Sequence, residues 1–104
     1  MHKLMILFER SADILDMETR WSNEFVQRAE AMPGLRRVSV SRVAGGPSGD
    51  VDLHMVHEFY FDDFQALQNA LSSPEGKVAG IALMSFAADN VTICFAEHLE
   101  EARG

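Results

Sequence analysis

Two periodicities alternate along the chain and predict its elements. In "WSNEFVQRAEAM", Trp21, Phe25, Ala29 and Met32 recur at steps of four and three, the period of a helix with one buried face. This pattern predicts a helix over about 13–32. Four other stretches are rich in β-branched and aromatic residues or alternate apolar with polar ones. We expect them to form strands at 3–9, 35–43, 51–61 and 91–97.

A second helical pattern lies between the third and fourth predicted strands. Asp62 or Asp63 should cap it, as Asp13 or Asp16 should cap the first helix, because a short acidic side chain accepts a hydrogen bond from the free N–H groups of the first turn. The stretch "SSPEG" then restarts the helix, with Ser73 as the new cap. The order βαββαβ predicts an α+β, ferredoxin-like fold, in which a four-stranded antiparallel sheet carries helices on one face.

Strand residues point alternately to opposite sides of a sheet, so the predicted strands define two faces. The nearly wholly apolar set should lie under the helices: Leu4, Ile6, Phe8, Val38, Val40, Met55, Phe59, Phe61, Val91, Ile93 and Phe95. The mixed set forms what we call the open face: Lys3, Met5, Leu7, Arg37, Ser39, Ser41, His54, Val56, Glu58, Tyr60, Thr92, Cys94 and Ala96. A mixed face suits a surface covered by a second copy, with a cavity between the sheets. We therefore expect a homodimer, although a slip of one residue in register would exchange the two sets.

Composition narrows the class of protein. A chain of 104 residues with 47% hydrophobic residues fits one domain, 1–104, with a real core. The net charge of -7 argues against nucleic acid and against an anionic membrane surface as partners. No apolar run approaches the roughly 18 residues of a membrane span, and no signal peptide is visible, so we expect a cytoplasmic protein. The single cysteine, Cys94, excludes an internal disulfide.

Three open-face residues of the third predicted strand are candidates for acid–base chemistry. Glu58 and Tyr60 are two residues apart on one face, or about 7 Å, and could both contact one small ligand. We take Glu58 or His54 as the candidate base and Tyr60 as the candidate proton donor. The structural alternative is that Glu58 forms an ion pair with Arg37 or Arg42, or with the second subunit, and has no chemical role.

The remaining polar residues favour binding or structure over catalysis. His54 and His57 form an H-x-x-H pair, but an odd separation in a strand places them on opposite faces, so we expect no shared metal ion. His57 should be buried with one hydrogen bond, and the terminal His2 and His98 should be exposed. The residues expected to line the ligand cavity are Met5, Leu7, Arg37, Ser39, Ser41, Val56, Thr92 and Cys94.

Three stretches resemble the EthD-like family of dimeric α/β-barrel proteins. They are "FERSADILDMETRW" (8–21), "MPGLRR" (32–37) and "FDDFQALQNALSSPEGK" (61–77). Members often carry His-x-Pro-Leu eight residues before the Pro-Gly that ends the first helix, and the matching position here is Phe25. Because a phenyl ring neither takes a proton nor binds a metal, the role of that histidine does not carry over. We interpret the apolar face of the first helix as scaffold.

The resemblance implies a homodimer that binds a small hydrophobic molecule and assists the catabolism of hydrophobic or aromatic compounds. The alternative is a cofactor-independent enzyme of the cyclase, isomerase or monooxygenase type, since related barrels include such enzymes. Both hypotheses need the same pocket, and neither needs a cofactor. Haem handling is a third possibility among related barrels, but the spacing of His54 and His57 does not favour it.

Overall fold

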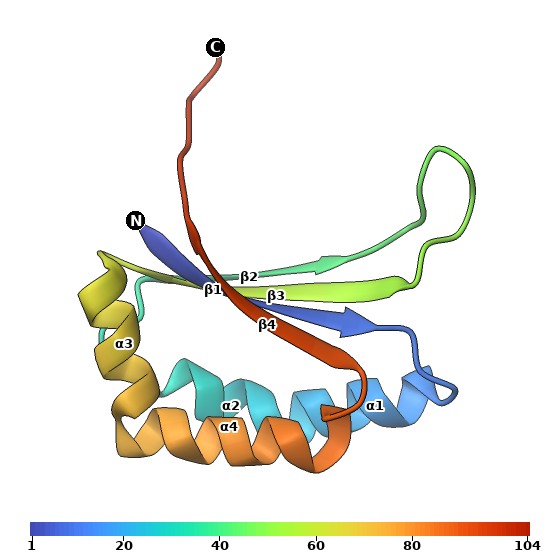
Figure 1. Ribbon diagram of the computed structural model, residues 1–104, viewed down its shortest axis with the longest axis horizontal. Coiled ribbons are helices and arrows are strands. Elements are labelled where there is room, and N and C mark those ends of the chain that lie inside the picture. Colours follow the sequence, from blue (N-terminus) through green and yellow to red (C-terminus); the bar gives the residue numbers. More distant parts are fainter.

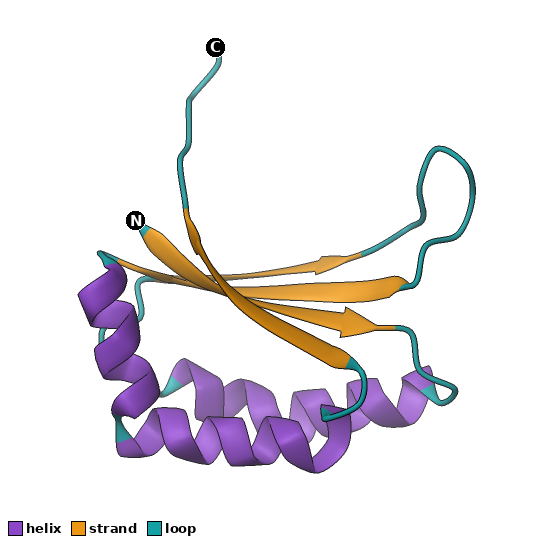
Figure 2. Cartoon of the chain, viewed as in Figure 1, coloured by secondary structure: helices purple, strands orange, loops and turns teal.

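The computed structural model describes all 104 residues and has the predicted ferredoxin-like fold (Figure 1). The sheet has the strand order β2-β3-β1-β4, and each neighbouring pair is antiparallel. All helices lie in one layer on one side of the sheet (Figure 2). The elements are β1 (His2–Glu9), α1 (Ile14–Arg20), η1 (Trp21–Phe25), α2 (Val26–Glu30), β2 (Arg37–Arg42), β3 (Leu53–Phe61), α3 (Phe64–Ser72), α4 (Pro74–Ala87) and β4 (Val91–Glu97).

The first predicted helix is continuous but contains a π-helical turn. Asp13 caps it and accepts a hydrogen bond of 3.0 Å from the backbone N–H of Asp16. At η1 the helix widens, so that the N–H of Val26 reaches the carbonyl oxygen of Trp21. Both Trp21 and Phe25 are buried. The apolar spacing predicted the helix and its buried face, but not the π turn between α1 and α2.

The second predicted helix breaks at Ser73, as expected. Asp63 caps α3 through the N–H of Ala66 at 2.8 Å, and Ser73 caps α4 through the N–H of Gly76 at 3.0 Å. The two helices meet so closely that a Cβ atom on Gly76 would lie 2.2 Å from the carbonyl oxygen of Ala70. Only glycine fits this corner without movement of the backbone. From there α4 runs for 14 residues.

The core lies between the sheet and the helix layer. The apolar residues of β1 and β3 on this side are all buried, which confirms the predicted register. The prediction that the whole apolar set lies under the helices was wrong for the edge strand β4. There Ile93 and Phe95 face the helix layer but remain 42% and 50% exposed. Val40 on the opposite edge is also exposed. The helix layer is narrower than the sheet, so it covers the two central strands and leaves the edges partly bare.

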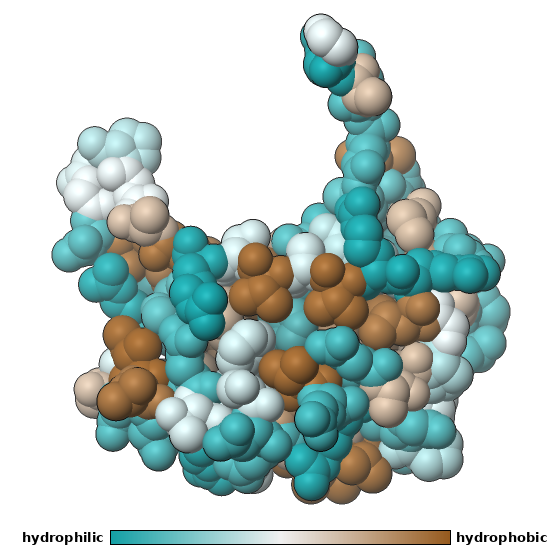
Figure 3. All heavy atoms as spheres, turned by 180° about the vertical axis from the view of Figure 1, so that it is seen from behind, coloured by the Kyte–Doolittle hydropathy of each residue, from teal (hydrophilic) through white to brown (hydrophobic).

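No helix covers the open face, and two segments project beyond it. The loop 43–52 between β2 and β3 and the C-terminal segment 98–104 both rise on this side (Figure 1). They stand on either side of a hollow in the surface (Figure 3). The radius of gyration is 14.3 Å, above the roughly 13 Å that a compact chain of this length would have. The two projecting segments account for this extended shape.

Candidate functional site

Tyr60 is the centre of a polar cluster on the open face. Its hydroxyl lies 3.3 Å from the Oγ of Ser39 and donates a long hydrogen bond of 3.5 Å to the Oε2 of Glu58. Glu58 is also paired with Lys3, and the two side chains are only 13% and 15% exposed. The structure thus brings together two of the three predicted acid–base residues. The ion-pair partner of Glu58 is Lys3, and neither of the two arginines expected for that role takes it.

The C-terminal segment and Arg37 enclose the ring of Tyr60. The His98 ring packs edge-on against it at a centroid distance of 4.8 Å, and the Arg37 guanidinium lies 4.3 Å from the ring centroid. Glu100 contacts both His98 and Arg37, and these two contacts hold the pKa of its carboxyl below the ordinary value. The expectation that His98 is exposed was wrong. Sequence reasoning missed His98 and Glu100 because their contacts depend on the path of the chain after β4.

The residues predicted to line a cavity do share the open face. Cross-strand pairing arranges them in three rows. The rows are Arg37, Tyr60, Lys3 and Ala96; Ser39, Glu58, Met5 and Cys94; and Ser41, Val56, Leu7 and Thr92. The alternation in the sequence therefore placed these residues together correctly. That they contact a ligand stays a prediction.

His54 does not join this cluster. Its Nε2 lies 2.7 Å from the Oε2 of Glu18, which comes from α1 in the helix layer and also accepts from Arg42. The β1–β3 register shifts between Phe8 and Glu9, next to this position, and such a bulge redirects side chains. The prediction that His54 shares a pocket with the acid–base pair was wrong for this reason. The bonds from Arg42 and His54 lower the pKa of Glu18 below its ordinary value.

His57 lies in the core, as predicted, and has one hydrogen bond. Its Nδ1 accepts from the indole Nε1–H of Trp21 at 3.1 Å, and its Nε2 has no partner. The ring is fully buried among aromatic side chains, with centroid distances of 4.2 Å to Phe59 and 5.9 Å to Phe25. Burial lowers the pKa of His57 to about 4, so the ring is neutral at pH 7.

An apolar pocket lies between the helix layer and the β1–β4 half of the sheet. Its volume is about 220 Å3, and 10 of its 12 lining residues are hydrophobic. The space exists because α4 has small residues, Gly76, Ala79 and Gly80, where it faces β4. The lining residues are Leu4, Ile6, Phe25, Ala29, Met32, Leu71, Gly76, Ala79, Gly80, Leu83, Ile93 and Phe95. Sequence reasoning missed this pocket, because it depends on how far the helix layer extends over β4.

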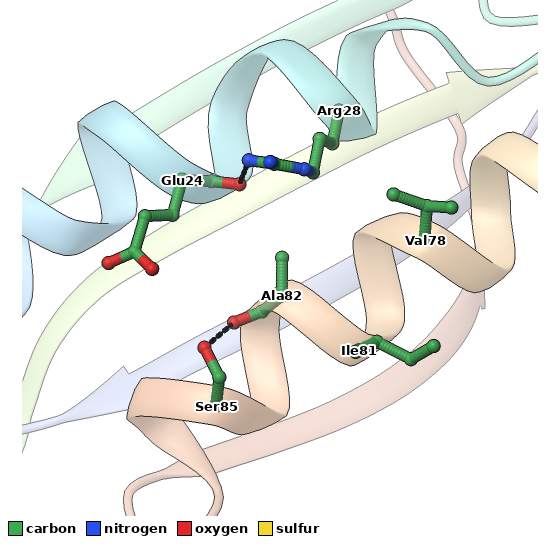
Figure 4. Close-up of a pocket in the computed structure, with 6 residues that line it drawn as sticks. All are labelled: Glu24, Arg28, Val78, Ile81, Ala82 and Ser85. Atoms are coloured by element: carbon green, nitrogen blue, oxygen red, sulfur yellow. Dashed lines mark hydrogen bonds between the residues drawn. The ribbon is translucent and has the colours of Figure 1, made fainter.

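A second, shallower groove runs along the outer surface of the helix layer. Figure 4 shows it between η1, α2 and α4, with a volume of about 320 Å3. Arg28 donates to the carbonyl oxygen of Glu24, and Ser85 donates to that of Ala82. Because these polar groups already bond within their own helices, the groove has few polar groups free to bind a ligand.

No three His, Cys, Asp or Glu side chains converge in a way that would hold a metal ion. None of the helices combines the length and the apolar character that crossing a bilayer requires.

The comparisons with known proteins agree with the geometry. The model of the EthD domain matches residues 15–89, which is most of the chain. This chain belongs to the EthD family. An ethyl tert-butyl ether D (EthD) family protein from Bacillus halodurans has 32% sequence identity and a TM-score of 0.92, covering 95% of this chain and 99% of that one. The resemblance noted in the sequence is thereby confirmed.

More distant structures share the fold of this EthD-family protein. One is a dimeric protein of unknown function with a ferredoxin-like fold from Bacteroides fragilis, at 19% identity and a TM-score of 0.65, covering 93% of this chain and 95% of that one. Another is a cofactor-independent oxygenase from Streptomyces nogalater, at 16% identity and a TM-score of 0.65, covering 96% and 93%. No curated protein matches the chain.

Proposed function

We propose that this EthD-family protein is a homodimer that binds a small hydrophobic molecule and assists the catabolism of hydrophobic or aromatic compounds. The observation that carries the proposal is the apolar pocket of about 220 Å3 in each subunit. Pockets that bind small organic molecules are concave and mostly apolar, and this one already exists in a single chain. It supports a ligand site better than the open face does, where polar side chains bond to one another.

Three features support a homodimer with the open faces opposed. The open face carries apolar side chains, including Met5, Leu7 and Val56, that no element of the chain covers. The loop 43–52 and the segment 98–104 project around that face, as segments that embrace a second copy would do (Figure 3). A fold neighbour is also described as dimeric. In such a dimer the residues of the open face would line the space between the sheets and offer a second ligand position.

Native mass spectrometry tests the dimer with a matched pair of variants. A lysine in place of Val56 would bury an unpaired charge between the sheets, so Val56→Lys should convert the dimer to a monomer. Val78→Lys introduces the same charge on the outer surface of α4, where the side chain is 48% exposed, and should leave the dimer intact. A monomeric wild type, or a Val56→Lys protein that stays dimeric, would contradict the proposed arrangement.

The pocket is tested by blocking it with the hydrocarbon tetralin as the probe. Ile93 lies at the rim of the pocket, so Ile93→Trp should fill the opening and weaken tetralin binding by about tenfold or more. Ile81→Trp makes the same change on α4 at a side chain that is 73% exposed and does not line the pocket, so it should bind like the wild type. Binding is measured by protein-observed NMR titration. Equal affinities for the two variants would refute the pocket as the site.

A cofactor-independent enzyme is the alternative function, and one observation favours it. The Tyr60 hydroxyl lies between the Glu58 carboxylate and Ser39 on the open face, so a proton donor and an acceptor are adjacent. Glu58→Gln keeps the shape and removes the base, so it should abolish turnover of a true substrate. Because the change also leaves Lys3 without its ion-pair partner, it should lower Tm, while the far-ultraviolet circular dichroism spectrum should show that the fold is retained. Unchanged turnover in this variant would remove Glu58 from the mechanism.

A further inference from the structure

The buried ring of His57 carries a hydrogen-bond donor that no other group in the protein uses. The side chain is fully buried, and its Nε2 atom has no partner. Buried polar groups in folded proteins are almost always hydrogen-bonded, so each exception needs an explanation. This one lies in the aromatic core next to the apolar pocket, away from the polar cluster of the open face.

The hydrogen bond from Trp21 determines what His57 can offer. Because Nδ1 accepts the indole N–H of Trp21, the proton of the neutral ring is on Nε2. The low pKa of the ring, about 4, keeps it neutral at physiological pH. The free position is therefore an uncharged N–H donor, and it can be satisfied only by an acceptor.

Two residues connect this donor to the pocket. The Phe25 ring lines the pocket and meets the His57 ring edge-on at an interplanar angle of 84°. Ile6 also lines the pocket and is the cross-strand neighbour of His57. His57 thus lies one side chain behind the pocket wall. The π turn that carries Trp21 and Phe25 fits this picture, because such turns occur frequently at functional sites.

A buried water molecule is a poor alternative partner for the Nε2–H. An ordered internal water needs about two to four polar groups to bind it. The rings that pack against His57 belong to Trp21, Phe25 and Phe59, and their one polar group, the indole N–H of Trp21, already donates to Nδ1. An acceptor atom on an otherwise apolar molecule meets both requirements, since it bonds to the N–H and fills apolar space.

We propose that His57 is the polar recognition group of the apolar pocket: binding displaces the Phe25 ring, and His57 Nε2–H donates a hydrogen bond to a neutral acceptor oxygen of the ligand. This inference rests on the pocket being the ligand site. It names the ligand class as compact, apolar molecules with one uncharged acceptor, such as a ketone. A carboxylate is disfavoured, because an ionised group would be buried beside a neutral donor with no charge to pair with it.

The test compares two probes of nearly the same shape, tetralin and 1-tetralone, which differ by the replacement of one CH2 by C=O. In the wild type, 1-tetralone should bind about fivefold to tenfold more tightly than tetralin, the contribution of one buried hydrogen bond. His57→Phe keeps an aromatic ring and removes the donor, so it should lose this preference and retain tetralin binding. Equal weakening of both probes, or an unchanged preference, would overturn the inference.

A second measurement needs no variant and therefore does not depend on the folding of His57→Phe. With ¹⁵N-labelled histidine in the wild type, 1-tetralone should shift the Nε2 and Nε2–H signals of His57, and tetralin should shift them much less. Identical shifts with both probes contradict a hydrogen bond to the carbonyl oxygen. If the wild type binds neither probe, the pocket proposal fails and this inference fails with it. If tetralin binds and 1-tetralone shows no preference, only this inference fails.

Discussion

Replacing Gly76 by alanine should destabilise the protein, whereas the same replacement at Gly80 should stabilise it. Both glycines lie within α4, four residues apart, and alanine is the better helix former at either position by about 1 kcal/mol. A Cβ atom at Gly80 meets no atom within 4 Å. Gly80→Ala should therefore gain about 0.5–1 kcal/mol in the free energy of unfolding.

At Gly76 the same gain is opposed by a collision with the backbone. A Cβ atom there would lie 2.2 Å from the carbonyl oxygen of Ala70 and 2.9 Å from two backbone atoms of Leu71. These atoms belong to the end of α3 and cannot turn aside as a flexible side chain can. Forcing α3 and α4 apart should cost about 1–3 kcal/mol or more, which exceeds the gain in helix propensity. Since both substitutions gain the same helix propensity, the two variants should differ by the cost of the collision, about 1–3 kcal/mol or more.

Urea denaturation followed by far-ultraviolet circular dichroism measures both values. All proteins should be compared at one concentration, because the stability of the proposed dimer would depend on it. Because m in urea is about 1–3 kcal/mol/M for a small protein, a change of 1 kcal/mol shifts the urea midpoint by about 0.3–1 M, so the two variants should be clearly separated. Equal stabilisation by both substitutions would refute the close contact between α3 and α4.

Three further predictions concern the buried and partly buried polar contacts. Trp21→Phe leaves the Nδ1 of His57 without a donor and should lower the free energy of unfolding by about 1–3 kcal/mol in urea denaturation. Burial lowers the pKa of His57 from an ordinary 6.5 to about 4 in the folded protein, so the unfolded chain takes up a proton first as the pH falls. The free energy of unfolding should therefore decline by about 3 kcal/mol from this group between about pH 6.5 and pH 4. His57→Phe should show a correspondingly smaller decline between these pH values. Glu18→Gln removes the carboxylate that accepts from Arg42 and His54, so it should lower Tm at pH 7; since the folded pKa of Glu18 is depressed, the gap to the wild type should close as pH falls below about 4.

The register of the sheet could be predicted because alternation is a local property. Leu4, Ile6 and Phe8 alternate with Met5 and Leu7 in the chain, and the structure places the two sets on opposite faces. A strand that keeps its pairing obeys this rule at each step. The helix caps were predictable for the same reason, since a cap side chain bonds to a backbone group only three residues away.

The rule failed where a distant contact or a local irregularity replaced it. Alternation assigns His54 to the open face. In the structure, next to the register shift at Glu9, its ring instead contacts the carboxylate of Glu18 in the helix layer. Phe95 has the periodicity of a core residue, yet it is 50% exposed, because it lies on an edge strand that the helix layer covers only in part, through Phe64 of α3. Neither outcome is encoded in the neighbouring residues. Both depend on how wide the helix layer is and where the sheet ends.

His57 shows the same limit for chemistry. The sequence places a histidine on the core side of a strand, and that placement alone predicts only a satisfied, structural side chain. Its proton is assigned by Trp21, which lies 36 residues earlier in a different layer of the fold. The same contact leaves Nε2 as a donor, with the Phe25 ring between it and the pocket. Phe25 is also the position at which relatives often carry a histidine. If His57 recognises a ligand as proposed, the first helix is more than scaffold, because it sets the tautomer of the one buried histidine and supplies the side chain that separates this histidine from the pocket.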